Sequence, residues 1–265
     1  MSIRMPAEHG AWGMLIVPTL SAAAVSGAWN VPVALCAALA LGLFVLRGSA
    51  DQQGGWRALR QAEHVALALV LLAMAGALVL VYGRTQLMAV AAAGIALYAL
   101  QQAMARAHNE AHTEKRSLSA ELAGVVLLSL AAPAAWISAR GRLELAGAQV
   151  WALNVLFFVG GVLYVKYRVR GLLAHREFSG WQERLAFAWP VFLYHFLLLT
   201  FLAASIFQRE LSAAVLLAFA PGILRASGLM FQLGERFPIK RLGWMEMAHS
   251  VVFAVLLVMT YRLAG

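Results

Sequence analysis

Charge and cysteine are both scarce in this sequence. Charged residues make up 12% of the 265 residues, about half of the fraction that is usual in a soluble domain. Cys36 is the one cysteine, so the chain has no internal disulfide framework and no metal site built from several thiolates. Composition therefore argues against a soluble domain and against a small disulfide-stapled scaffold.

Apolar residues are abundant instead. They account for 62% of the chain, and the mean hydropathy is +0.76. This composition predicts an all-α fold, a polytopic bundle of transmembrane helices. No signal-peptide cleavage site follows the first apolar run, which starts at Ala11, so we expect that run to remain as a helix. The formal net charge of +9 lies in short loops between apolar runs, so we expect no nucleic-acid binding.

The apolar runs give the number of membrane spans. A spanning helix needs about 20 mostly apolar residues, and by that rule the sequence predicts about nine spans in one integral membrane domain, 1–265. Pro221 and Gly222 lie inside the eighth span and predict a kink there. The second span is short and could be tilted or partly re-entrant. The predicted spans are 11–28, 31–46, 64–82, 86–104, 122–137, 149–165, 185–207, 211–233 and 244–261.

The basic residues predict the orientation. With nine spans, 16 of the 21 Lys and Arg residues fall on the side of the N-terminus and five on the other side. We therefore expect a multi-pass protein of the cell inner (plasma) membrane. The positive-inside rule places its N-terminus in the cytoplasm and its C-terminus outside. Nearly all polar candidate residues lie on the same side, so a functional site would face the cytoplasm.

A basic cluster ends the sixth span. The apolar run before it stops at Lys166, and Arg168, Arg170 and Arg176 follow within ten residues. Such a cluster is typical either of a topological anchor or of an anion site. Within the span, Gly160 and Gly161 indicate close approach of a neighbouring helix.

His195 is the most informative single residue. It lies about ten residues into the seventh span, near the middle of the bilayer at about 1.5 Å per residue. An ionisable residue at that depth is a functional candidate by default, although a neutral histidine can also simply bond to a neighbouring helix.

Two further histidine groups deserve notice. Glu8 and His9 open the first span as a carboxylate–histidine pair, which suits a proton relay or a bound group as well as a helix cap. His108 and His112 are four residues apart, a spacing that places both on one helix face and suits a metal ion. No third ligand is evident, so a polar loop with incidental histidines is the favoured interpretation.

Four stretches carry a resemblance to a family. They are 6–15 (PAEHGAWGML) with Pro18 beyond it, 157–166 (FFVGGVLYVK), Tyr194 with His195, and 237–246 (FPIKRLGWME). In this order they resemble the YwiC-like family of bacterial membrane proteins. The resemblance implies a bacterial inner-membrane protein and supplies no reaction.

A more distant similarity concerns topology. Nine helices with polar motifs at the cytoplasmic ends of spans two and six are similar to the UbiA superfamily of intramembrane prenyltransferases, which hold a prenyl diphosphate through magnesium on two aspartate-rich motifs. Here the corresponding stretches are 47–53 (RGSADQQ), with one carboxylate, and 166–170 (KYRVR), with none. Because magnesium needs clustered oxygen ligands, we expect no such metal site. Lys166, Arg168, Arg170 and Arg47 are the candidates for direct contact with a phosphate group.

Three kinds of function remain open. The first is binding or conversion of an anionic, lipid-like or isoprenoid-phosphate-like ligand, with Glu8, His9 or His195 in acid–base roles. The second is a small-solute or proton-coupled transporter that uses His195. The third is a membrane assembly protein whose basic face docks a partner or anionic lipid. His195, His249 and His9 also permit haem ligation, although their predicted depths differ. Membrane lipids are the one partner expected in every case.

Overall fold

The structure is a computed structural model of the chain, and it describes residues 3–6, 9–53, 60–110, 118–173, 178, 180–233 and 238–264. Every regular element in these ranges is helical. The chain divides into two compact units, residues 1–151 and 152–265. Each unit is described by itself, and the predicted single domain stays a prediction.

In its described residues, the first unit contains six α-helices and the beginning of a seventh. A short π-helix, η2 (Ala77–Val81), continues α3. Leu130 separates α5 from α6 ahead of Pro133, because proline lacks the N–H that would bond to the preceding turn. The helices are α1 (His9–Ser26), α2 (Val31–Gln52), α3 (Ala62–Gly76), α4 (Leu87–Glu110), α5 (Leu118–Ser129) and α6 (Ala131–Arg140), followed by the start of α7 (Leu145–Leu173).

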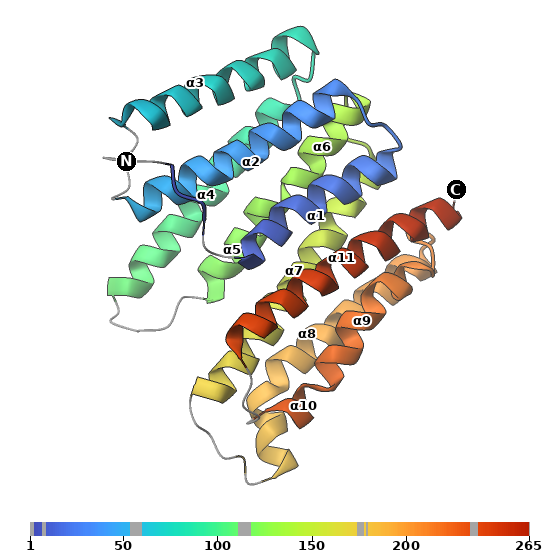
Figure 1. Cartoon of the computed structure of the whole chain (residues 1–265). Helices are drawn as coiled ribbons and strands as arrows, with labels where there is room; N and C mark the ends of the chain where they lie inside the picture. Colours follow the sequence, from blue (N-terminus) through green and yellow to red (C-terminus); the bar gives the residue numbers. More distant parts are fainter. Residues whose placement is uncertain are drawn as a thin grey trace. The chain divides into compact units, whose positions relative to one another are not determined.

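Packing in the first unit centres on α6. Helices α1 and α2 both lie against it, α3 lies on α2, and α4 lies on α5 (Figure 1). Small residues allow these approaches: a Cβ built on Gly42 of α2 would come 2.3 Å from the Leu71 side chain of α3. Close contact at small residues is the ordinary way in which helices associate in lipid.

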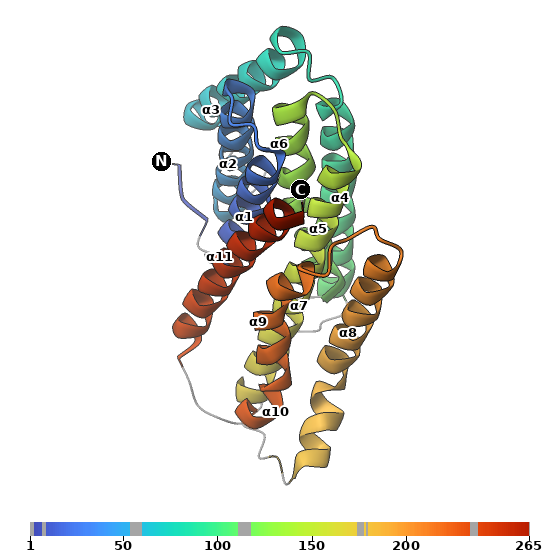
Figure 2. The same ribbon diagram turned by 90° about the vertical axis from the view of Figure 1, so that its right-hand side faces the viewer.

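The second unit consists of the rest of α7 with α8 (Trp181–Phe207), α9 (Val215–Ser227), α10 (Leu229–Gln232) and α11 (Ile239–Ala264). Helix α9 packs against α11 and α8, and the one-turn helix α10 extends it beside α8 (Figure 2). Three aromatic rings hold α7, α9 and α11 together. Phe253 stacks on Phe157 with ring centroids 4.0 Å apart and meets Phe219 edge-on at 5.3 Å.

The predicted spans are largely present. Seven of them correspond to helical segments that are long and apolar enough to cross a membrane. The first and eighth correspond to shorter apolar helices, over residues 10–26 and in α9. The chain is therefore a multi-pass helical membrane protein by helix length and hydropathy, while its predicted orientation stays a prediction.

Several helices extend beyond the predicted ends of their spans. The second span is not short in the structure, because α2 has 22 residues and includes Arg47 and Asp51, while a tilted or partly re-entrant path stays a prediction. Its start at Val31 is as predicted, since the Asn30 side chain accepts a hydrogen bond from the Val33 N–H at 3.1 Å. Likewise, α7 does not stop at Lys166 but runs on for seven residues.

The kink predicted at Pro221 stays a prediction. Pro221 lies inside α9, and the helix ends later, at Ser227, with Gly228 separating it from α10. Neighbouring helices can support a proline inside a membrane helix, and here α8 and α11 flank α9. The helix is interrupted at Gly228, and glycine lacks the side-chain contacts that favour a continuous helix.

Candidate functional site

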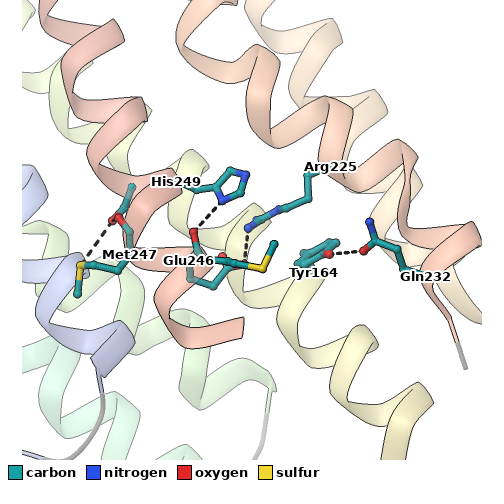
Figure 3. A network of polar contacts seen from close by, with 8 residues as sticks. Tyr164, Arg225, Gln232, Glu246, Met247 and His249 are labelled. Carbon is teal, nitrogen blue, oxygen red and sulfur yellow. Dashed lines mark hydrogen bonds and ion pairs between the residues drawn. The ribbon is translucent and has the colours of Figure 1, made fainter. Parts of the chain in front are cut away.

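An ion pair inside the second unit is the nucleus of the candidate site. The Arg225 guanidinium of α9 bonds through Nη1 to Oε1 of Glu246 on α11 (Figure 3). The Arg225 side chain is only 9% exposed and that of Glu246 19%. Charges withdrawn this far from water are costly unless they are paired, which explains why these two side chains point at each other.

Tyr164 of α7 extends the ion pair into a network. Its ring lies under the guanidinium, with Arg225 Cζ 4.1 Å from the ring centroid, a cation–π contact. Its hydroxyl donates a hydrogen bond of 2.6 Å to Oε1 of Gln232 on α10 (Figure 3). Tyr164 therefore has one contact at the face of its ring and another at its hydroxyl. Four elements of the unit, α7, α9, α10 and α11, are thus joined in one network.

A narrow cleft opens beside Arg225. Its empty volume is about 280 Å³, which includes space open to the surroundings, and the cleft has room for roughly one water molecule. Residues of α7, α8 and α9 line it, among them Gly160, Gly161, His195, Phe219, Gly222 and Arg225. The Nε of Arg225, one of these lining residues, is a buried N–H donor with no hydrogen-bond partner among the described residues.

His195 lines the same cleft. It stands 14 residues from the start of α8 and 12 from its end. Its Nδ1 donates to the Val191 carbonyl at 2.8 Å, because that oxygen can only accept. In the neutral ring Nε2 is then the acceptor, and it faces Gly160 of α7. The site therefore combines a cation, a carboxylate and an imidazole acceptor.

The glycine pair of α7 makes this arrangement possible. A Cβ on Gly160 would lie 3.1 Å from Tyr194 Cε1 and 3.6 Å from His195 Nε2, and one on Gly161 would lie 3.4 Å from Glu246 Oε2. The predicted close helix approach at these two residues is confirmed. It brings the helix backbone against the polar side chains of α8 and α11.

We expect Gly160→Leu to lower the free energy of unfolding by about 1–3 kcal/mol, because its side chain must displace Tyr194 or His195. Unfolding in detergent would measure the loss. Gly243→Leu is the matched control, since a Cβ on Gly243 meets nothing within 4 Å. Equal losses for the two variants would contradict the close approach.

The basic residues of α7 do not act as one cluster in the structure. Arg168 is 5% exposed and lies within electrostatic range of Tyr164. Lys166 and Arg170 are half-buried and, two residues either side of Arg168, lie on another helix face. The Arg170 Cζ is 5.8 Å from the Tyr167 ring centroid. Arg168 is thus the α7 cation placed nearest to the network, and anion binding by these residues stays a prediction.

Arg47 belongs to the first unit and has contacts of its own. Its Nη2 donates to Gln101 Oε1 at 2.9 Å, its Nε lies 3.7 Å from Asp51 Oδ2, and its Cζ lies 4.6 Å from the centre of the Tyr98 ring. The carboxylate that follows the second span is therefore engaged with an arginine. A phosphate-binding role for Arg47 stays a prediction.

A second polar network surrounds Ser49 in the first unit. Its Oγ accepts from the Arg4 N–H at 3.0 Å and from Gln53 Nε2 at 2.9 Å. With both lone pairs used, its O–H donates to His64 Nε2 at 3.0 Å. Ser49 and His64 are almost completely buried. The network ties the segment before α1 to α2 and α3.

The remaining predicted residues cannot be placed as side chains. Glu8 and His112 lie outside the described residues, and for His9 and His108 the structure describes the helix backbone alone. Within the described part of the chain, no group of three or more His, Cys, Asp or Glu side chains could hold a metal ion.

Sequence reasoning missed four members of the site. None of the sequence patterns assigns a role to Arg225, Glu246, Tyr164 or Gln232. A usable signal was present: Arg225 about two turns inside the eighth span and Glu246 in the first turn of the ninth are charges of opposite sign near the same predicted side of the membrane, and such charges are expected to pair.

These features define a multi-pass helical membrane protein with an ionised polar network inside its second unit. Residues 5–136 match the family model described as YwiC-like protein. This match supports the predicted YwiC-like relation, most directly for the first unit. The candidate site lies beyond the matched residues.

Two curated proteins are similar to the chain. "Uncharacterized protein YwiC" of Bacillus subtilis is 26% identical over 261 residues, which cover 96% of each chain. An "Uncharacterized protein" of Haemophilus influenzae is 27% identical over 144 residues, 54% of this chain and 53% of its own. No solved structure matches the chain.

Proposed function

We propose that this membrane protein binds an anionic, lipid-like ligand in its second unit, at the end of the helices predicted to face the cytoplasm. Arg225 is the principal contact, with Arg168 and Lys166 adding positive charge from α7. A phosphate or phosphate-ester headgroup is the class of anion that matches a guanidinium best, because the planar fork can donate two parallel hydrogen bonds to it.

One observation carries this proposal. Arg225 is nine-tenths buried on the wall of the cleft, and its Nε has no partner among the described residues. A buried donor without a partner costs about 1–3 kcal/mol, and an acceptor oxygen in the cleft would remove that cost. The cleft has room for roughly one water-sized group, so a single oxygen of the headgroup would enter it.

Magnesium-dependent prenyl transfer does not fit the donor set. Asp51 pairs with Arg47, and the stretch 166–170 contains no carboxylate. Magnesium prefers carboxylates and phosphates in an octahedral shell, and these positions offer mostly cations. The similarity to the UbiA superfamily therefore extends, in this proposal, to a helical container for a lipid-like ligand and not to its chemistry.

Native mass spectrometry in mild detergent, with extraction of the bound lipids, tests the proposal. We expect a co-purifying anionic lipid in the wild type, reduced about tenfold or more in Arg225→Gln and reduced less in Lys166→Ala. Arg241→Gln, an exposed position on α11, is the matched control. An unchanged lipid complement in Arg225→Gln would refute the proposal.

A proton-coupled transporter is the second candidate, and His195 favours it. An imidazole acceptor in the middle of a span, on a cleft lined by an arginine that is itself paired with a glutamate, is the kind of arrangement that proton pathways use. Solute uptake into proteoliposomes, driven by a pH gradient and lost in His195→Gln, would support this function. Haem is a poor fit here, because the enclosed space beside His195 is far too small for a porphyrin.

A further inference from the structure

We propose that the first unit binds an anionic phospholipid of its own. One acyl chain lies in a groove between α1 and α2, and the phosphate lies beside arginines near the turn between α6 and α7. Every residue of this site belongs to the first unit, so the inference is independent of the anion site proposed around Arg225.

The groove has a volume of about 310 Å³, at the lower end of the usual range for ligand pockets. It exists because α1 and α2 both pack against α6 and present small side chains towards the space between them. Its walls include Ala23 of α1 and Ala34 and Ala37 of α2. This is room for a thin hydrocarbon chain.

The polar side chains on the groove are already hydrogen-bonded within the unit. The Thr19 hydroxyl donates to the Leu15 carbonyl at 2.7 Å. The Asn30 Oδ1 accepts from the Val33 N–H, and its Nδ2 donates to the Ala139 carbonyl, each at 3.1 Å. The groove therefore offers contact to hydrocarbon and little to a polar solute.

The rim of the groove identifies its surroundings. Leu20 is 47% exposed and Trp29 63%, and both line the groove. Tryptophan is enriched where a membrane meets water, so we expect the Trp29 end to lie at headgroup level. An empty groove would leave its walls without dispersion contacts, and acyl chains are the apolar groups that surround a membrane helix.

Two arginines approach the same end of the groove. The bond from Asn30 places Ala139, the last residue but one of α6, at that end, and the next residue is the exposed Arg140. Arg84, in the turn before α4, reaches the same place from another part of the chain. Its Nη1 lies 2.6 Å from the position of a Cβ built on Gly141.

The charge at this end is positive and suits a phosphate. Arg142 is compensated by Glu144, whose Oε1 lies 3.4 Å from its Nε, and the stretches 83–86 and 140–144 contain no other acidic residue. Arg84 and Arg140 therefore leave a surplus of positive charge. The Arg84 Nε is also buried without a hydrogen-bond partner among the described residues. Guanidinium groups bind phosphate oxygens well, so an anionic phospholipid complements both parts of the site.

Native mass spectrometry of the full chain in mild detergent tests the groove. The Arg225→Met/Glu246→Met variant serves as the parent, because it lacks the proposed anion site of the second unit. We expect it to bind one palmitoyl-oleoyl-phosphatidylglycerol, and Ala34→Trp to weaken this binding at least tenfold by filling the groove. Ala92→Trp, at an exposed alanine of α4, is the matched control. Short-chain dihexanoyl-phosphatidylglycerol should bind here only weakly, because it buries fewer methylene groups.

The headgroup contact is tested on the same parent. Arg84→Gln/Arg140→Gln should weaken binding of palmitoyl-oleoyl-phosphatidylglycerol by about tenfold or more, since each arginine near the membrane surface attracts an anionic lipid. Binding of the zwitterionic phosphatidylcholine with the same chains should change much less. Arg209→Gln, at an exposed arginine also predicted to lie outside, is the matched control.

Four outcomes would overturn the inference. Equal lipid binding by Ala34→Trp and Ala92→Trp would mean that the groove is not the site. Equal affinity of the parent for the two headgroups would remove the role of the arginines. A dimer of the chain that is lost in Ala34→Trp would make a second copy the occupant. Lipid that binds the wild type but not the parent would refute this site and support the one at Arg225.

Discussion

Arg225→Met should lower the free energy of unfolding by about 3–5 kcal/mol. The substitution keeps most of the side-chain volume but leaves the Glu246 carboxylate buried without its partner, and an unpaired buried charge typically costs this much. The loss would be measured by reversible unfolding in mixed micelles with increasing SDS. Arg241→Met, on an exposed side chain, should change stability by no more than about 0.5 kcal/mol.

The double variant Arg225→Met/Glu246→Met should recover most of that loss. Replacing both charges by apolar side chains of similar size removes the desolvation penalty together with the attraction. Recovery would show that the two residues are coupled across α9 and α11. A double variant that loses as much as the two single variants added together would mean that the ion pair does not form in the protein.

Phe253→Ala should cost about 3 kcal/mol, at the lower end of the range for a buried phenylalanine. Phe253 is 1% exposed and contacts the rings of Phe157 and Phe219, both of which line the cleft. In lipid the loss comes from packing and the cavity left behind, since lipid tails are as apolar as the side chain. We therefore also expect weaker ligand binding, because two walls of the cleft lose their support.

Phe201→Ala is the control for that variant. Phe201 is also on a long helix of the second unit but is 47% exposed, so its ring has few protein contacts to lose. Its unfolding midpoint in SDS should stay within experimental error of the wild type. A comparable loss for both variants would contradict the assigned aromatic core.

The fold class followed from composition because lipid imposes a simple rule. A chain with 62% apolar residues in runs of about 20 can satisfy its backbone in the membrane as helices. Helix starts were well predicted where local chemistry marks them. At the start of α2, Asn30 caps the helix and Pro32 lies in its first turn. These signals are read from a few adjacent residues.

The ends of α2 and α7 were predicted too early for a physical reason. Hydropathy locates the apolar part of a span, but a helix continues into the polar interface as long as its backbone hydrogen bonds remain favourable. The basic residues at Arg47 and Lys166 therefore marked the edge of the apolar region and not the end of the helix. The same distinction explains why the KYRVR stretch has different faces: in a helix, Arg168 turns away from Lys166 and Arg170.

The candidate site was predictable only in part. His195 could be identified from its depth in one span, and Gly160 with Gly161 from their small size. The pairing of Arg225 with Glu246 depends on the rotation of two helices about their axes, and residues 21 positions apart carry no local signal of that. Tyr164 and Gln232 are common interfacial residues whose roles emerge only once α7 and α10 are placed beside the guanidinium.

Binding of dihexanoyl-phosphatidylglycerol to the wild type and to the Arg225→Met/Glu246→Met double variant is the most direct test of the anion site. The double variant should remain folded, so a loss of binding can be assigned to the guanidinium and not to unfolding. We predict saturable binding to the wild type at pH 6 and at least tenfold weaker binding to the double variant. Equal affinities of the two proteins would contradict the assignment of Arg225 as the anion-binding residue.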